Sequence, residues 1–157
     1  MQLNTYLKGL FAFNCTANFQ LMEKVGGMPD QAEAIRLLSH LVNCQIKWLA
    51  RIRQEPGAAA LDWWQPLYTL AELPGKWKDS CDVWMDFLDH HDDAFLGTEV
   101  VYEGWEGRPL AATPQDIAQQ LIFHSVHHRA QIQTMLREQG IEPDFVDYIG
   151  TRTRAVS

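Results

Sequence analysis

The sequence predicts an all-α protein, a four-helix bundle of a single domain over residues 1–157, from two observations. Four long segments repeat apolar residues at helical spacing, and glycine or proline follows or precedes each of them. A chain of 157 residues corresponds to one domain and can bury a substantial core. We expect helices from about Leu3 to Lys24, from Asp30 to just before Pro56, from about Pro74 through Phe95, and from Pro114 to just before Gly140.

Two of these helices have recognisable start signals. The second opens with Asp30-Gln-Ala-Glu33, which matches a capping box with Asp in place of Ser or Thr. The fourth has Thr113 as N-cap, Pro114 at the first helical position and Asp116 in the first turn. Both signals favour helices at these places.

The connections also carry structure. Residues 58–68 indicate a connection that contains Trp63 and Trp64. Residues 98–102 and 108–112 flank a turn with two glycines, which predicts a small hairpin between the third and fourth helices. Beyond Pro143, residues 144–148 predict one short turn of helix.

Composition excludes some classes of function. The net charge is −7 and basic residues form only short clusters, so nucleic-acid binding is not expected. No apolar run is long enough to span a membrane, and no signal-peptide pattern opens the chain, so we expect a cytoplasmic protein. In that compartment Cys15, Cys44 and Cys81 are expected to be buried free thiols. Cys44 lies four positions after His40, close to any metal there, although simple packing accounts for it as well.

The histidines give the most specific signal. His124 and His128 are four positions apart on the apolar face of the fourth helix, a spacing at which two imidazoles can bind one metal ion. His40 lies at the edge of the apolar stripe of the second helix and can face this pair. Three histidines with positions left for water form a catalytic rather than a structural metal site. The alternative is that each histidine is hydrogen-bonded within the core without a metal.

The same residues carry a family resemblance. His40 on the second helix, and the segment HSVHHRAQI followed by LREQGIEPDFVDY, resemble the DinB/YfiT-like superfamily of metal-dependent enzymes over essentially the whole chain. The resemblance implies a four-helix bundle in which His40, His124 and His128 bind a divalent metal such as Zn, Ni, Mn or Fe. His127 falls outside this triad. The family usually has glycine after the arginine, where this chain has Ala130.

The resemblance also implies a reaction class. Characterised members include transferases and isomerases that use a low-molecular-weight thiol such as mycothiol, bacillithiol or glutathione. We therefore expect a metal-dependent thiol S-transferase or isomerase acting on a small-molecule substrate. A metal-dependent hydrolase is one alternative, and a non-catalytic, stress-related binding or interaction protein is another. Catalytic residues beyond the metal ligands are not identified.

Several other polar residues are open to two interpretations. Asn14 and Asn18 can reach the site, but side chain–backbone bonds are the more common use of such residues. Arg129 lies one step off the histidine face and is expected to pair with Asp144 or Asp147. The run His90-His91-Asp92-Asp93 resembles a metal motif, but its place at the end of the third helix favours a solvated surface run.

Six tryptophans are many for a chain of this size, and three of them, Trp63, Trp64 and Trp105, fall in connections. Exposed aromatic residues of this kind mark an interface or a ligand pocket. Because two-fold dimers are the commonest assembly, we expect a homodimer that pairs through its helices.

Overall fold

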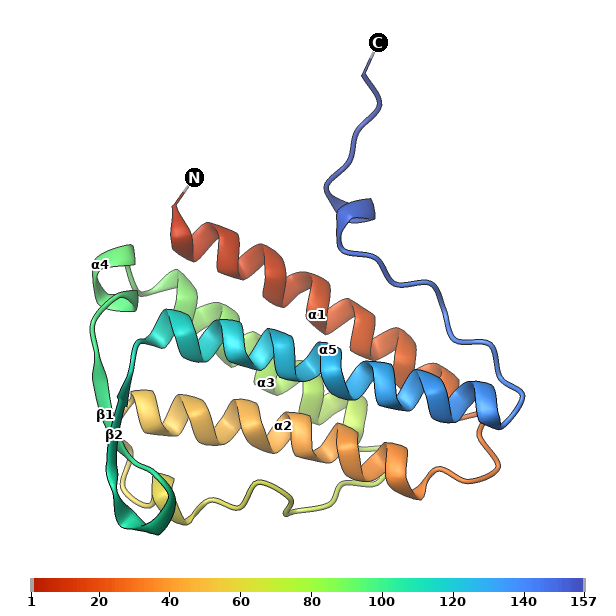
Figure 1. Ribbon diagram of the computed structural model, residues 1–157, viewed down its shortest axis with the longest axis horizontal. Helices are drawn as coiled ribbons and strands as arrows, with labels where there is room; N and C mark the ends of the chain where they lie inside the picture. The colour runs from red at the N-terminus through yellow and green to blue at the C-terminus, as the bar shows by residue number, and fades with distance from the viewer. Residues whose placement is uncertain (1, 157) are drawn as a thin grey trace.

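The computed structural model describes residues 2–156 and is mostly helical (Figure 1). Its helices are α1 (Leu3–Val25), α2 (Ala32–Ile52), α3 (Leu73–Asp89), α4 (Asp93–Leu96) and α5 (Pro114–Glu138). Strands β1 (Val100–Glu103) and β2 (Pro109–Ala112) form an antiparallel pair, and short 3₁₀ turns occupy Ala58–Ala60, Trp105–Gly107 and Ile149–Thr151. The all-α bundle with a hairpin insertion is confirmed.

The four long helices form a bundle in which α1 and α2 are diagonal partners. Each of these two helices packs against both α3 and α5 (Figure 1). The connection after α2, residues 53–72, runs back along that helix, so α3 begins at the same end of the bundle as α2 and runs in the same direction. This long connection leaves one side of α2 covered by irregular chain that carries Trp63 and Trp64.

Two apolar clusters fill the bundle. One is built around Trp77, whose indole nitrogen donates to the carbonyl of Cys15. The other is built around Trp84, which stacks on Phe11 and donates to the carbonyl of Gln45. The fully buried indoles have the polar partner that a buried N–H requires.

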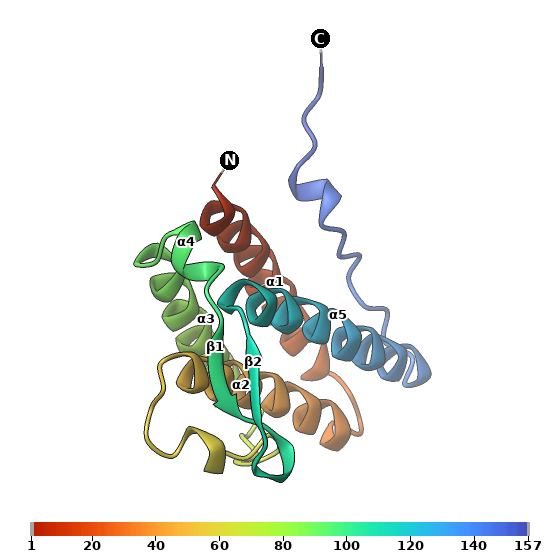
Figure 2. The ribbon, with the colours of Figure 1, turned by 60° about the vertical axis from the view of Figure 1, so that its left-hand side comes forward.

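The hairpin lies across the end of the bundle where α2 finishes and α5 begins (Figure 2). Its register pairs Val100 with Ala112 and Glu103 with Pro109. Thr113 caps α5 as expected, since its hydroxyl accepts from the backbone N–H of Asp116. The predicted start of α5 and the predicted hairpin are therefore confirmed.

Three details of the sequence interpretation are wrong. The third helix ends at Asp89, because Asp92 starts the separate helix α4 by accepting from the backbone N–H of Phe95. The capping box at α2 does not form: Glu33 instead binds the Arg36 guanidinium through two contacts of 2.7 and 2.6 Å. The short turn near the C-terminus falls at residues 149–151 rather than 144–148.

The cysteine expectation is also wrong for two of the three residues. Cys15 of α1 and Cys81 of α3 form a disulfide that closes 66 positions of sequence. Their spacing gave no hint of this, because only the packing of α1 against α3 brings them together. Cys44 is a buried free thiol, as expected. Among residues 2–156, no helix combines the length and apolar character needed to cross a membrane.

Candidate metal centre

Three histidines meet where α2 packs against α5. His40 extends from α2, and His124 and His128 extend from successive turns of α5. The Nε2 atom of His124 lies 3.2 Å from Nε2 of His40 and 2.8 Å from Nε2 of His128. The helical spacing that the sequence shows thus places Nε2 of His124 within 3.2 Å of the Nε2 atoms of both other histidines.

The far side of two of these rings is held by oxygen acceptors. Nδ1 of His40 lies 2.7 Å from the carbonyl oxygen of Trp63, and Nδ1 of His128 lies 2.6 Å from Oε1 of Gln131. Because these oxygens accept, Nδ1 carries the proton in each neutral ring and Nε2 presents its lone pair. Metal-binding histidines are held in the same way, with the ring nitrogen away from the metal donating to an oxygen acceptor.

Burial keeps the three imidazoles neutral. His40 and His128 are 7 % and 8 % exposed. Burial lowers the pKa of both rings, although the Trp63 carbonyl and the Gln131 amide act in the opposite direction. For His124, burial and then the charges of the neighbouring histidines lower the pKa to about 4. Neutral imidazole is the form that binds a metal.

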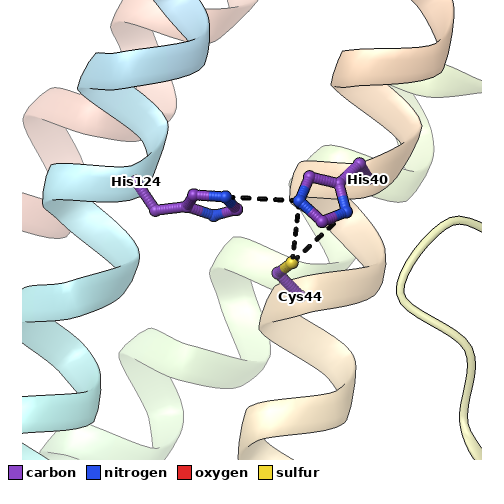
Figure 3. Close-up of side chains that lie close together, drawn as sticks. All are labelled: His40, Cys44 and His124. Atoms are coloured by element: carbon purple, nitrogen blue, oxygen red, sulfur yellow. Dashed lines mark hydrogen bonds between the residues drawn. The ribbon is translucent and has the colours of Figure 1, made fainter.

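Cys44 adds a fourth donor atom. It lies one turn after His40 on α2, and its Sγ is 3.6 Å from each ring nitrogen of that histidine (Figure 3). Ligand atoms of His40, Cys44 and His124 all lie within 4.8 Å of one another, and His128, the third histidine of the predicted set, is not part of this compact group. Burial raises the pKa of the Cys44 thiol to about 12, so the group is neutral unless a cation lies beside it.

The two nitrogen separations measured from His124 are compatible with a divalent ion. Ligand nitrogens about 2.1 Å from a metal are about 3.0 Å apart at octahedral angles and about 3.4 Å apart at tetrahedral angles. The observed separations of 2.8 and 3.2 Å come close to these values. Without a cation, two or three lone pairs would face one another in a partly buried space, where a single proton on His124 can serve only one neighbour well.

An aromatic wall covers the outer side of this centre. The indole of Trp64 stacks on the His40 ring with centroids 3.8 Å apart and planes inclined by 11°. The guanidinium of Arg36 lies 4.2 Å from the centroid of that indole. The connection after α2 therefore supplies both an acceptor for His40 and a cover for it. The sequence placed tryptophans in this connection but gave no signal of where they would lie.

Arg129 lies inside the bundle and away from the acids expected to pair with it. It is 5 % exposed, and one of its terminal nitrogens donates to Oδ1 of Asn14 and Oδ1 of Asn18, each at 3.0 Å. Asp144 instead pairs with Lys24 at 3.1 Å. The predicted pair is therefore wrong, and the two asparagines neither reach the metal centre nor bond to neighbouring backbone: they solvate a buried guanidinium.

His127 is exposed, and its ring lies beside that of His128, with centroids 5.1 Å apart; its exclusion from the ligand set stays a prediction. The His90–Asp93 run is partly structural. His90 is exposed, but His91 is half-buried against Phe87 and Phe95. The carboxylate of Asp93 accepts from the backbone of α1. The predicted solvated run therefore holds for His90, Asp92 and Asp93, which are exposed, and fails for His91.

Comparison with known proteins gives a consistent family assignment. The model of the DinB family matches residues 30–155, which includes all three histidines and Cys44. The chain is 24% identical over 137 residues to the uncharacterized protein YizA of Bacillus subtilis (strain 168), and this match covers 87% of the chain and 81% of that relative. No solved structure matches the chain.

Proposed function

Because the chain belongs to the DinB family, we propose that it is a metal-dependent enzyme whose divalent ion is held by His40, His124 and His128. Zn, Ni, Mn or Fe suits imidazole ligands of this kind. The reaction proposed is transfer or isomerisation that uses a low-molecular-weight thiol, with a small molecule as the other substrate.

One observation carries the metal proposal: the orientation of the rings. Trp63 and Gln131 hold Nδ1 of His40 and His128, so both rings direct Nε2 toward His124. A cluster that only stabilised the fold would need donors opposite these lone pairs, and the described residues offer one N–H of His124 and the weak S–H donor of Cys44, whose Sγ lies 3.6 Å from Nε2 of His40. The ring orientations thus favour a cation between the helices.

The number of histidines favours a catalytic centre. Three protein ligands leave at least one exchangeable position, whereas structural sites close all four. A divalent ion in such a site lowers the pKa of a coordinated thiol or water, which is the chemistry that the proposed reaction requires. Trp64, which is 38% exposed, covers His40 on the side that faces solvent and would limit access to this position.

Metal analysis of purified variants tests the ligand set. The wild type should carry about one divalent ion per chain. His40→Ala, His124→Ala and His128→Ala should each lose it, while His127→Ala should retain it because that ring faces solvent. Two ligand sets are possible, the three histidines or His40, Cys44 and His124. Retention of metal in Cys44→Ser supports the three histidines, and a loss comparable to that in His128→Ala shows that the thiol is a ligand. Unchanged metal in both His40→Ala and His124→Ala would refute the site.

A cobalt-substituted protein tests the reaction. Glutathione, bacillithiol, mycothiol and coenzyme A are added in turn, and sulfur-to-cobalt charge transfer is followed in the near ultraviolet. A thiol that binds the ion should also raise the melting temperature, because a ligand of the folded state stabilises it by RT ln(1 + [L]/Kd). Cys44→Ser serves as the background for this measurement, since it removes the protein's own nearby thiol.

The same experiment separates the remaining alternatives. Metal-dependent ester or amide hydrolysis, without a response to any thiol, would replace the transferase by a hydrolase. Absence of both activities with stoichiometric metal would favour a binding or stress-related interaction role.

Assembly is a separate proposal. Phe123 and Val126 of α5 are 66% and 46% exposed, and a homodimer that pairs through this helix would cover them. Sedimentation of wild type and Phe123→Glu tests it. A shift from dimer to monomer is expected in the variant.

A further inference from the structure

A cavity lies beyond the histidines, where the hairpin meets the C-terminal half of α2. It has a volume of about 350 Å³ and lies between α2, the connection that follows it, and the hairpin. Its main lining consists of four aromatic residues and two basic ones: Trp48, Trp63, Tyr102, Trp105, Lys47 and Arg51. We call this cavity the hairpin pocket. Figure 2 shows the hairpin crossing this end of α2.

The two basic residues are buried without a direct ion pair. Lys47 is 5% exposed and Arg51 is 8% exposed. Within residues 2–156, no carboxylate oxygen lies within 4.0 Å of either charged group, and Asp62 and Glu103 act on them only from a longer distance. A buried cation is costly unless it is paired. Two of them in one pocket indicate that an anion from outside completes the site.

Backbone oxygens satisfy these groups only in part. The ammonium of Lys47 donates to the carbonyls of Ala59 and Leu61. One terminal nitrogen of Arg51 donates to the carbonyl of Glu103 at 2.9 Å. The Nε–H of Arg51 is buried and has no partner in the described chain. Since guanidinium presents five donors in a planar fork that matches a carboxylate, Arg51 retains donors for a ligand.

Aromatic rings hold the cations and provide flat walls. The ammonium of Lys47 lies 4.5 Å from the ring centroid of Trp63. The guanidinium of Arg51 lies between rings, 4.9 Å from Trp48, 5.0 Å from Trp63 and 4.9 Å from Tyr102. These contacts fix the positive groups in place before any ligand arrives, which reduces the ordering cost of binding.

We propose that the hairpin pocket binds a small organic acid, with its carboxylate at Arg51 and Lys47 and a flat, unsaturated body between the aromatic side chains. The volume lies at the lower end of the range for small-molecule pockets, about 300–1,000 Å³. Trp105, which is 76% exposed, borders the pocket on the hairpin side.

The pocket lies in line with the metal centre. His40, Cys44, Lys47 and Arg51 are spaced by four, three and four positions, so they share one face of α2. The rise of about 1.5 Å per residue separates Cys44 from Arg51 by about 10 Å along the helix. Trp63 belongs to both sites, since its carbonyl accepts from His40 and its ring lines the pocket. An acid bound here would extend toward the histidines as the second substrate. This link to the reaction rests on the proposed function, whereas acid binding does not.

Calorimetry on the metal-free wild type tests acid binding alone. The probe is 1-naphthoate, and 1-naphthylmethanol serves as its neutral counterpart of nearly the same shape. We expect one naphthoate per chain and at least tenfold weaker binding of the alcohol. The Arg51 Nε–H resonance of the wild type should move on addition of naphthoate. Equal binding of both probes, or no naphthoate binding, would overturn the proposal.

Matched variants on α2 and at its C-cap assign the effect to these residues. Arg51→Gln and Lys47→Gln should each weaken naphthoate binding at least tenfold, while Arg53→Gln should not, because Arg53 is exposed and lies near Glu55 at 3.8 Å. Equal losses in all three variants would overturn the assignment. If Arg51 and Lys47 only hold the hairpin in place, the wild type should not prefer naphthoate to the neutral alcohol. The wild-type measurement therefore decides the proposal even where a variant misfolds. Metal content is measured separately. Absence of metal would contradict the proposed function without affecting the acid-binding result.

Discussion

Gln131 accepts from the outer nitrogen of His128: Oε1 of the amide lies 2.6 Å from Nδ1 of the imidazole, one turn along α5. Acceptors of this kind fix the tautomer of a metal-binding histidine, and their loss costs about 10–100-fold in metal affinity. We therefore predict that Gln131→Ala weakens metal binding by about this factor without abolishing it. Competition with a chelator measures the affinity.

A matched control for this change lies on the same helix. Gln133 lies two positions further on, off the histidine face, where it lines a small space against α1. Gln133→Ala should leave the metal affinity at the wild-type value. Equal affinities in Gln131→Ala and the wild type would mean that the amide does not orient His128.

Sequence reasoning reached the histidines because helical periodicity fixes which residues share a face. His124 and His128 must lie on one face of any helix that contains them. His40 was predicted to face them because it lies at the edge of the apolar stripe of the second helix. The outer acceptors were missed. Gln131 stands three positions after His128, a spacing at which side chains meet, so the motif itself held this signal. The carbonyl of Trp63 had none, because the path of an irregular connection depends on packing and not on local pattern.

The buried arginine shows a different limit. The sequence placed Arg129 next to the histidine face, and a charged residue there suggested an acidic partner near the C-terminus. Packing of α1 against α5 supplies Asn14 and Asn18 instead, and burial lowers the pKa of Arg129 to about 10. The asparagines that bind Arg129 carry no charge, so no opposite charge in the sequence points to them. Their contact with Arg129 could therefore not be predicted before the fold was known.

This cluster yields a second prediction. Asn18 accepts from Arg129 and donates to the hydroxyl of Ser125 at 2.8 Å. Asn18→Ala removes both bonds inside the core, and loss of a buried partner of a charged group should lower the free energy of unfolding by about 2–4 kcal/mol. Urea denaturation measures the change.

The control for that variant is Thr16→Ala. Thr16 is exposed on the same helix, and its hydroxyl only donates to the carbonyl of Ala12. Its substitution should stay within about 0.5 kcal/mol of the wild type. A similar small effect in Asn18→Ala would show that water or another donor replaces the asparagine.

The Cys15–Cys81 disulfide gives a third prediction. In the chain-entropy model, closing a loop of 66 positions restricts the unfolded state and stabilises the fold by about 4 kcal/mol. We expect Cys81→Ser, or reduction of the wild type, to lower the melting temperature clearly. Cys44→Ser lacks this effect, because Cys44 is outside the disulfide. If a reductant leaves the melting temperature of the wild type unchanged, the two thiols do not form a stabilising bond in solution.

The fourth prediction concerns helix α1 and the carboxylate of Asp93. Gln2, the residue before α1, makes no side-chain cap, and Asp93 instead accepts from the backbone N–H groups of Leu3 and Asn4 at 2.9 and 3.0 Å. An acid at a helix N-terminus satisfies free N–H groups and interacts favourably with the helix dipole. Asp93→Ala should therefore lower the melting temperature near neutral pH. His90→Ala should have no such effect, because that ring is exposed.

The effect of Asp93→Ala should disappear in acid. The N–H groups of Leu3 and Asn4 lower the pKa of the Asp93 carboxyl from its ordinary value of 3.8. A depressed carboxyl pKa stabilises the fold above the unfolded value, and this contribution is lost as the pH falls through the lower, folded value. The difference in melting temperature between wild type and Asp93→Ala should be full at pH 6 and should shrink once the pH is well below 3.8. The difference between the two melting temperatures removes the contribution of the other carboxylates, which both proteins share. A difference that stays constant with pH would show that the charge of Asp93 does not cap α1.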